Sequence, residues 1–188
     1  MHLIILGPHG AGKGTQAKLV AQHYKIAHIS TGDILREHIK NKTNVGIKAK
    51  EYIAASKYVP DKIVDVVVVL KLRNNKEGFV LDGYPRTLVQ AEFLNNVLRE
   101  LGIELDAAIN LQVDKEELIK RMIKRGQKEK RTDDTEEGIR SRMNEYETKA
   151  EPVIKYYRGM GKVIDINGDQ SIEKVFKDIK EILDKLER

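Results

Sequence analysis

The 188-residue sequence contains no cysteine and no tryptophan, and its longest uninterrupted apolar run is only Val66–Leu70. Without cysteine the chain can form no disulfide, thiolate zinc site or cysteine nucleophile, which fits a reducing compartment. The apolar run is far shorter than a membrane-spanning helix, and the first residues have neither the basic segment nor the cleavage site of a signal peptide. We therefore expect a cytoplasmic protein that binds neither zinc nor a membrane.

The excess of positive over negative side chains in the sequence is also small. Lys and Arg number 34 against 29 Asp and Glu, which leaves a net charge of +5. Such an excess is compatible with a nucleic acid, an anionic membrane or a phosphate-rich small substrate, although most of these side chains are expected simply to form a solvated surface. Because the sequence has no long basic run and aromatics make up only 5% of it, we do not expect a nucleic-acid partner.

Short apolar runs alternate with helical patterns along the whole chain, and no repeat or low-complexity linker interrupts them. This alternation predicts a single α/β domain, 1–188, in which helices cover both faces of a parallel sheet. We expect strands at 3–6, 26–29, 79–81, 107–113 and 163–166. We expect helices at 13–24, 34–40, 45–55, 61–72, 87–101, 115–125, 135–157 and 172–186. Gly126 is expected to end the sixth helix before a loop at 127–132, and Pro152 to bend or break the seventh.

The segment Gly7–Thr15, GPHGAGKGT, follows a predicted strand and opens a predicted helix. It matches the G-x-x-x-x-G-K core of the Walker A motif, in which glycines let successive backbone N–H groups turn toward phosphate oxygens. The helix N-terminus adds the positive end of its dipole, and Lys13 adds a mobile cation for the transferring phosphoryl group. Gly14, not Ser or Thr, follows the lysine, so Thr15 is only a candidate for contacting magnesium or phosphate. The motif predicts a nucleoside triphosphate site without naming the second substrate.

Four further segments join this motif in the order and spacing of nucleoside monophosphate kinases. The five are Gly12–Gln16 (GKGTQ), Ser30–Asp33 (STGD), Asp82–Arg86 (DGYPR), Arg131–Asp134 (RTDD) and Arg140–Arg142 (RSR). On these residues the chain resembles the adenylate kinases, from Met1 to the C-terminal helix. The resemblance implies a phosphotransferase that interconverts ATP plus AMP with two ADP and uses Mg²⁺ as Mg-ATP.

The same resemblance implies a P-loop NTPase-like three-layer sandwich with a central five-stranded parallel sheet flanked by helices. Only five residues separate Arg125 from Arg131, where long-form enzymes carry a lid domain that often contains a cysteine-rich zinc site. The chain is therefore similar to the short form, in which the insert closes over AMP and a short loop over ATP, excluding water. The implied parts are a core at 1–29, 60–125 and 132–188, a small helical AMP-binding insert at 30–59 and a lid loop at 126–131.

Phosphoryl transfer needs positioning and charge neutralisation, to which planar, permanently charged guanidinium groups are suited. By resemblance, Arg36 and Arg86 bind the AMP phosphate, Arg121 and Arg125 bind ATP with Arg121 stacking on its adenine, and Arg131 and Arg142 act on the transferring group. The implied catalytic residues are Lys13, Asp82, Arg86, Arg121, Arg131 and Arg142. The implied ATP-binding residues are Gly10, Ala11, Gly12, Lys13, Gly14, Thr15, Arg121, Arg125 and the backbone near Gln170. The implied AMP-binding residues are Thr31, Arg36, Lys57, Val59, Gly83, Arg86, Gln90, Arg131 and Arg142.

Three of these assignments leave alternatives open. Asp82 ends a strand as a Walker B aspartate does and is expected to hold magnesium through water, although a turn-forming aspartate before glycine has the same pattern. Asp133 and Asp134 either orient the neighbouring arginines or, in one case, favour the start of the helix near Thr135. His9 stands where the family usually has proline. It is either a turn residue without further role or a ring that approaches the phosphates and gains a proton when they bind.

The choice of AMP as acceptor depends on Thr31 and Gln90, which sit where adenylate kinases contact adenine. UMP/CMP kinases usually have alanine in place of Thr31 and glutamate in place of Asp33. Another nucleoside monophosphate kinase, acting on UMP, CMP or GMP, is the first alternative. A P-loop protein that binds or hydrolyses ATP in association with nucleic acid is the second. The oligomeric state is not determined by the sequence, and a monomer is the default.

Overall fold

The computed structural model describes residues 1–129 and 135–186. Its centre is a five-stranded sheet with the strand order β2-β3-β1-β4-β5, in which every neighbouring pair is parallel. This is the α/β sandwich that the sequence predicts, and each predicted strand is present within one residue at either end. The strands are β1 (His2–Leu6), β2 (Ala27–Ser30), β3 (Phe79–Asp82), β4 (Ala107–Gln112) and β5 (Val163–Asn167).

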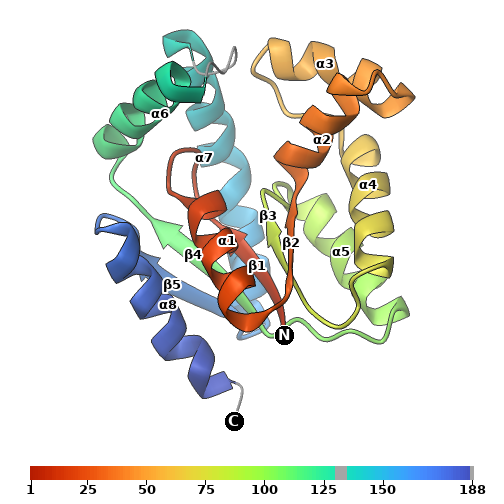
Figure 1. Ribbon diagram of the computed structural model, residues 1–188, viewed down its shortest axis with the longest axis vertical. Helices are drawn as coiled ribbons and strands as arrows, with labels where there is room; N and C mark the ends of the chain where they lie inside the picture. Colours follow the sequence, from red (N-terminus) through yellow and green to blue (C-terminus); the bar gives the residue numbers. More distant parts are fainter. Residues whose placement is uncertain (130–134, 187–188) are drawn as a thin grey trace.

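Successive strand residues point to opposite faces of the sheet, and the residues on both faces are apolar. Helices therefore cover both faces. In β1, Leu3 and Ile5 point into a core with α1, α6 and α8, whereas Ile4 and Leu6 point into a core with α4 and α5. Figure 1 shows α1 and α8 on one face, and α7 passing behind the sheet. The helices are α1 (Lys13–Tyr24), α2 (Thr31–Lys40), α3 (Asn44–Ala54), α4 (Asp61–Arg73), α5 (Leu88–Glu100), α6 (Lys115–Glu129), α7 (Glu136–Gly159) and α8 (Ile172–Leu186).

One expectation about a helix end is wrong, and of the expected bend or break at Pro152 the break is absent. The helix α6 continues through Gly126 to Glu129, so most of the expected lid loop at 126–131 is helical. A glycine inside a helix costs only about 1 kcal/mol relative to alanine, which the flanking helix-forming residues offset. The helix α7 is likewise one continuous element that contains Pro152. The expected Arg131 and its neighbours Asp133 and Asp134 lie outside the described residues.

The STGD segment begins a helix three residues earlier than expected. Ser30 is the N-cap of α2, and its hydroxyl accepts a hydrogen bond from the backbone N–H of Asp33 at 3.4 Å. Thr135 caps α7 in the same way by accepting from the N–H of Gly138. The helices α2 and α3 stand on one side of the carboxyl ends of the strands and α6 stands on the other (Figure 1). They therefore flank the edge at which the sequence places the motifs.

Across the part of the chain that the structure describes, no helix combines the length and the apolar composition that crossing a membrane requires.

Candidate active site

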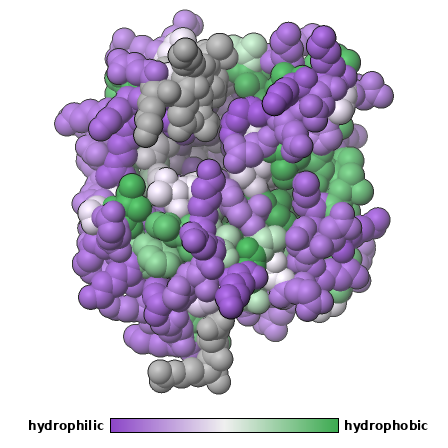
Figure 2. Space-filling model, viewed as in Figure 1, coloured by the Kyte–Doolittle hydropathy of each residue, from purple (hydrophilic) through white to green (hydrophobic). Residues whose placement is uncertain are grey.

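A pocket of about 1230 Å³ lies at the carboxyl edge of the sheet, between the α2–α3 pair and α6. Its volume exceeds the usual range for one small-molecule site, so there is room for more than one nucleotide. The surrounding face of the molecule is mostly hydrophilic (Figure 2). Every described residue that the sequence assigns to nucleotide binding or catalysis lines this pocket. The structure thus brings together residues that are separated by up to 160 positions, from Gly10 to Gln170.

The phosphate loop joins β1 to α1 and owes its shape to glycines with positive φ angles. A Cβ atom at Gly7 (φ 137°) would lie 2.8 Å from the carbonyl oxygen of Leu111. At Gly10 (φ 86°) it would lie 2.9 Å from the side chain of Met122 in α6. Both positions therefore require glycine, for backbone angle and for space. The loop ends at the N-terminus of α1, where backbone N–H groups and the helix dipole favour an anion.

Lys13 begins α1 and folds back over this loop. Its Nζ donates hydrogen bonds to the carbonyl oxygens of Gly7 and Pro8, both at 2.8 Å. Burial lowers the pKa of Lys13 to about 7, against the opposing attraction of Asp82. Arg86, Arg125 and Arg142 lower this pKa further. The loop is consequently a concentration of positive charge that a polyphosphate would neutralise.

Asp82, the last residue of β3, faces the start of α1. Burial would raise the pKa of its carboxyl group, but the contact with His28 and the charge of Lys13 outweigh burial and lower the pKa. The carboxylate is therefore ionised at neutral pH. Its Oδ2 lies 3.5 Å from Nε2 of His28 and so close to Gly14 that an added Cβ there would be 3.2 Å away.

The donor set around Asp82 fits Mg²⁺. Among the residues that the structure describes, no group of three or more His, Cys, Asp or Glu side chains could hold a metal ion by protein ligands alone. Magnesium in phosphoryl-transfer sites is typically held by one or two carboxylates together with water and substrate phosphates. A single ionised carboxylate beside the phosphate loop is what such a site requires of the protein.

Arg86 follows β3 and is held by contacts on several sides. Its Nε donates to the carbonyl oxygen of Gly83 at 2.7 Å, and its Nη1 lies 3.4 Å from Nε2 of His9. Its guanidinium carbon lies 4.9 Å from the ring centroid of Tyr58. Gly83 has φ 77°, and a Cβ there would come within 3.0 Å of Nη2 of Arg86 and of the Thr31 hydroxyl. Glycine at this position makes room for both side chains.

Thr31 and Gln90, on which the sequence prediction of AMP as acceptor depends, are almost fully buried in the pocket wall. The Thr31 hydroxyl donates to the carbonyl oxygen of Gly83 at 3.0 Å. In the amide of Gln90, Oε1 accepts from the backbone N–H of Arg86 at 2.7 Å and Nε2 donates to Asp61 at 2.8 Å. An amide has a second N–H and a second lone pair, so these bonds fix its orientation and still allow pairing with a base edge.

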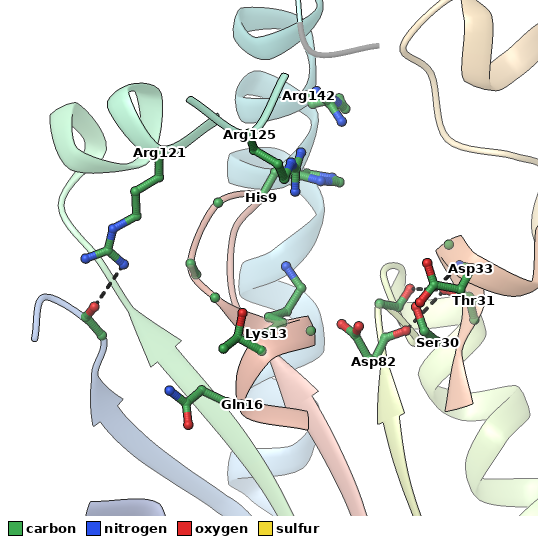
Figure 3. A pocket seen from close by; sticks show the side chains of 18 of the residues that line it. His9, Lys13, Gln16, Ser30, Thr31, Asp33, Asp82, Arg121, Arg125 and Arg142 are labelled. Carbon is green, nitrogen blue, oxygen red and sulfur yellow. Dashed lines mark hydrogen bonds between the residues drawn. The ribbon is translucent and has the colours of Figure 1, made fainter. Parts of the chain in front are cut away.

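The remaining arginines approach the pocket from α2, α6 and α7. The ion pair of Arg36 with Asp33, at 2.5 Å, is exposed. Arg121 bonds to Glu117 at 2.7 Å and to the carbonyl oxygen of Gly168 at 3.0 Å. Arg142 is buried in the wall, and Figure 3 shows Arg125 beside His9 above the phosphate loop, with Arg121 standing apart on the α8 side. Cations thus reach the pocket from several directions, as charge neutralisation on phosphates requires.

Gln170 lines the pocket next to Gly168 and Ser171. Its side-chain amide donates to the carbonyl oxygen of Asn167 at 2.9 Å and to Asp178 at 3.0 Å. These two bonds occupy the side-chain amide of Gln170. The assignment of the backbone near this residue to ATP binding stays a prediction.

The sequence interpretation did not include four polar residues of this region. Tyr58 stands between the assigned Lys57 and Val59, and Asp61 follows them at the start of α4. His28 lies two residues before Ser30, which pairs with Asp82, so strand alternation could have placed His28 on the same face as Asp82. Lys124 lies on the pocket side of α6, within one turn of Arg121. This helical spacing was the available signal.

Comparison with known proteins agrees with this site. A family model described as "Adenylate kinase" matches residues 5–162. The adenylate kinase of Leptospira biflexa is 47% identical over 175 residues, covering 92% of this chain and 94% of the relative. That of Archaeoglobus fulgidus is 42% identical and covers 99% of both chains, and that of Parabacteroides distasonis is 44% identical and covers 96% of both. The chain therefore belongs to the adenylate kinase family.

Proposed function

We propose that the protein catalyses the reversible, magnesium-dependent transfer of a phosphoryl group from ATP to AMP, giving two ADP. The observation that carries this proposal is one pocket that is lined by a phosphate loop and by a second set of polar and cationic side chains, Thr31, Arg86 and Gln90, which suits a second nucleotide. A protein that only hydrolyses ATP has no need of the second set. The names of its relatives support the same activity.

On the donor side, the phosphate loop and Lys13 would bind the ATP phosphates, with Arg121 and Arg125 beside them. Lys13 would exchange its two carbonyl partners for phosphate oxygens, and their negative charge would raise its lowered pKa. Magnesium, when bound, supplies further neutralisation of the phosphate charge. Asp82 is the residue that would hold it, through water.

On the acceptor side, Arg86 and Arg36 would bind the AMP phosphate, and Thr31 and Gln90 would contact its adenine. Lys57, Val59 and Gly83 would complete the base pocket with backbone atoms. No general base is required, because the acceptor phosphate is already ionised at neutral pH. The work of the protein is then to align the two phosphates, to spread their charge over Lys13, Arg86, Arg142 and Arg131, and to exclude water.

Domain parts and location belong to this proposal as well. The segment 30–59, which carries α2 and α3, would be the AMP-binding insert, and the segment 126–131, which includes the end of α6, would act as the lid. The nucleotides ATP, AMP and ADP are the proposed partners, and the cytoplasm is the proposed location.

The decisive experiment measures ADP formation from Mg-ATP with AMP, UMP, CMP or GMP as acceptor, and repeats each assay with the metal chelated. Fast transfer to AMP that disappears on chelation is the expected result. Preference for a pyrimidine monophosphate would retain the reaction and overturn the roles of Thr31 and Gln90. Hydrolysis of ATP without transfer to any acceptor would overturn the kinase and leave a P-loop protein of another kind.

A further inference from the structure

Two segments of the chain contact the Arg86 side chain, His9 from the phosphate loop and Tyr58 from the end of the insert. Lys149 from α7 contacts the ring of Tyr58. The rings of His9 and Tyr58 have centroids 6.1 Å apart, and the charged ends of Arg86 and Lys149 each lie 4.9 Å from the centroid of Tyr58. A cation at this distance from an aromatic ring is attracted to the negative π-face. Lys149 is also held by Glu145 at 2.6 Å.

The bond between His9 and Arg86 can form in only one direction. A guanidinium group has five N–H donors and no acceptor, so Nε2 of His9 must accept the hydrogen bond from Nη1 of Arg86. A ring nitrogen that accepts carries no proton, and the neutral ring must then carry its proton on Nδ1. The geometry therefore requires a neutral His9 in one particular tautomer.

The charges around His9 are consistent with a neutral ring. Burial is the main reason why the pKa of His9 lies well below its usual value, and the charge of Arg86 is the next. Lys13, Arg142 and Arg125 lower this pKa further. A protonated ring would face these cations, whereas a neutral ring can be a partner for one of them.

Together these contacts orient the guanidinium plane. The carbonyl of Gly83 holds Nε, His9 holds Nη1, and the ring of Tyr58 lies against the guanidinium group. The two hydrogen bonds use two of the five N–H groups, and the Tyr58 hydroxyl is a further side-chain partner of the guanidinium group. The remaining N–H groups can bind an anionic ligand. A fork-shaped donor that is oriented before its ligand arrives loses less entropy on binding than one that is free to rotate.

We propose that His9 and Tyr58 are positioning residues that hold Arg86 in the orientation required by the acceptor phosphate before AMP binds. The proposal rests on the function proposed above. It assigns to His9 a role toward Arg86 that differs from both alternatives that the sequence left open, a turn residue without further role and a ring that gains a proton when phosphates bind. It assigns to Tyr58 a role that the sequence did not indicate.

The first test is spectroscopic and does not depend on catalysis. In nucleotide-free, ¹⁵N-labelled protein, the His9 ring signals are assigned by their loss in His9→Gln. We expect an unprotonated Nε2 and a protonated Nδ1, with the exposed His23 ring as an internal comparison. A proton on Nε2, or a cationic ring at neutral pH, would overturn the proposal.

The second test separates the hydrogen bond from the ring. His9→Phe keeps a ring against Tyr58 but has no acceptor, whereas His9→Gln keeps an acceptor near the position of Nε2. Because the lost bond joins a charged donor to a neutral acceptor, we expect His9→Phe to raise KM for AMP by about fivefold and to leave KM for ATP within about twofold. His9→Gln should restore KM for AMP to within about twofold of wild type.

Tyr58 provides an independent pair of variants. Tyr58→Leu removes both the π-face and the hydroxyl contact with Arg86 and should raise KM for AMP by about threefold. Tyr58→Phe keeps the face and loses only the hydroxyl, so it should raise this KM less than Tyr58→Leu does. The matched control is His23→Leu, which removes ring contacts with Tyr24 and Phe176 outside the pocket. If the effect is specific to Arg86, this control should leave both KM values unchanged, whatever it does to the melting temperature.

The outcomes distinguish this proposal from the function on which it rests. A wild-type chain that fails to phosphorylate AMP would overturn the proposed function and, with it, the role toward the acceptor. Active wild type with an unchanged KM for AMP in both His9→Phe and Tyr58→Leu would overturn this inference alone. Equal increases in both KM values that follow a loss of melting temperature would show a purely structural role, and would overturn it as well.

Discussion

The two cations Lys13 and Arg86 face the same pocket but are held in opposite ways. Two of the three ammonium donors of Lys13 are directed back to carbonyl oxygens of its own loop. Arg86 is held at Nε by the Gly83 carbonyl, at Nη1 by His9 and at its face by the ring of Tyr58, and it keeps N–H groups for a ligand. Lys13 must therefore exchange partners to bind phosphate, whereas Arg86 can add phosphate to the partners that it already has.

This difference follows from the shapes of the two groups. An ammonium group is a compact charge on a flexible stem, so it can change partners with little loss of geometry. A guanidinium group is a flat fork whose strength depends on the direction of its N–H groups. Under the proposed function, the donor side of the pocket would neutralise charge and the acceptor side would orient a phosphate. Four predictions test this contrast, in order of decreasing effect.

Replacement of the ammonium group should have the largest effect. We expect Lys13→Ala to lower kcat/KM for ATP by about 10³-fold, because no other described cation emerges from within the phosphate loop and such preorganised charges stabilise the transition state directly. Steady-state assays with varied Mg-ATP at saturating AMP measure this loss. Circular dichroism should show a folded protein, and a loss smaller than about tenfold would contradict the role of Lys13.

Arg86→Lys keeps the positive charge and removes the planar guanidinium group. If orientation matters on the acceptor side, this variant should lower kcat/KM for AMP by about 100-fold although the charge is unchanged. The same change should leave the dissociation constant of ATP within about threefold, as isothermal titration can show. Nearly normal use of AMP by Arg86→Lys would mean that charge alone is sufficient and would remove the contrast between the two sides.

Gln90→Leu tests the base pocket on the acceptor side. It removes the amide that is held by Asp61 and the backbone of Arg86, together with the proposed pairing to adenine. We expect KM for AMP to rise about tenfold, since one good bidentate amide–adenine pair contributes about 1–3 kcal/mol. Initial rates with AMP and UMP compared side by side provide the measurement. If discrimination between the two acceptors is unchanged, the base is selected elsewhere.

The smallest expected effect is the uptake of a proton by Lys13 when ATP binds. Because the pKa of Lys13 is lowered to about 7, its amine is mostly neutral in the free protein at about pH 8. Bound triphosphate raises this pKa, so ATP binding should take up a fraction of a proton, and ATP affinity should fall as the pH rises above 7. Titration calorimetry in buffers of different ionisation enthalpy measures the uptake. Lys13→Ala is the control, and equal uptake by this variant would place the proton elsewhere.

Much of the fold could be predicted because it depends on local patterns. The five strands and the helix that starts at Lys13 follow from apolar periodicity and from the glycines that end a strand. The helix ends were less predictable. Gly126 is a signal for the end of α6, yet the helix continues to Glu129. The low helix propensity of one glycine is outweighed by the higher propensity of its neighbours. Pro152 within α7 is a second case.

Among the site residues, those in motifs could be predicted and those that support them could not. Lys13, Asp82 and Arg86 belong to segments with fixed spacing. Tyr58 and His28 belong to no such segment, and their importance arises only from what they contact. The side-chain bonds of Gln90 to Asp61 and to the backbone of Arg86 were equally invisible, because no pattern specifies which partner a buried amide finds.

By itself, the sequence determined the α/β class, the phosphate loop, the exclusion of disulfides and thiolate zinc sites, and the membership in a family of nucleotide kinases. These properties depend on residue types and their spacing along the chain. The tertiary structure decided that Lys13 bonds to its own loop, that Arg86 is held by His9 and Tyr58, and that Asp82 remains ionised despite burial. The physical reason is that bond directions and electric fields at a point depend on three-dimensional distances, which neighbours in sequence do not reveal.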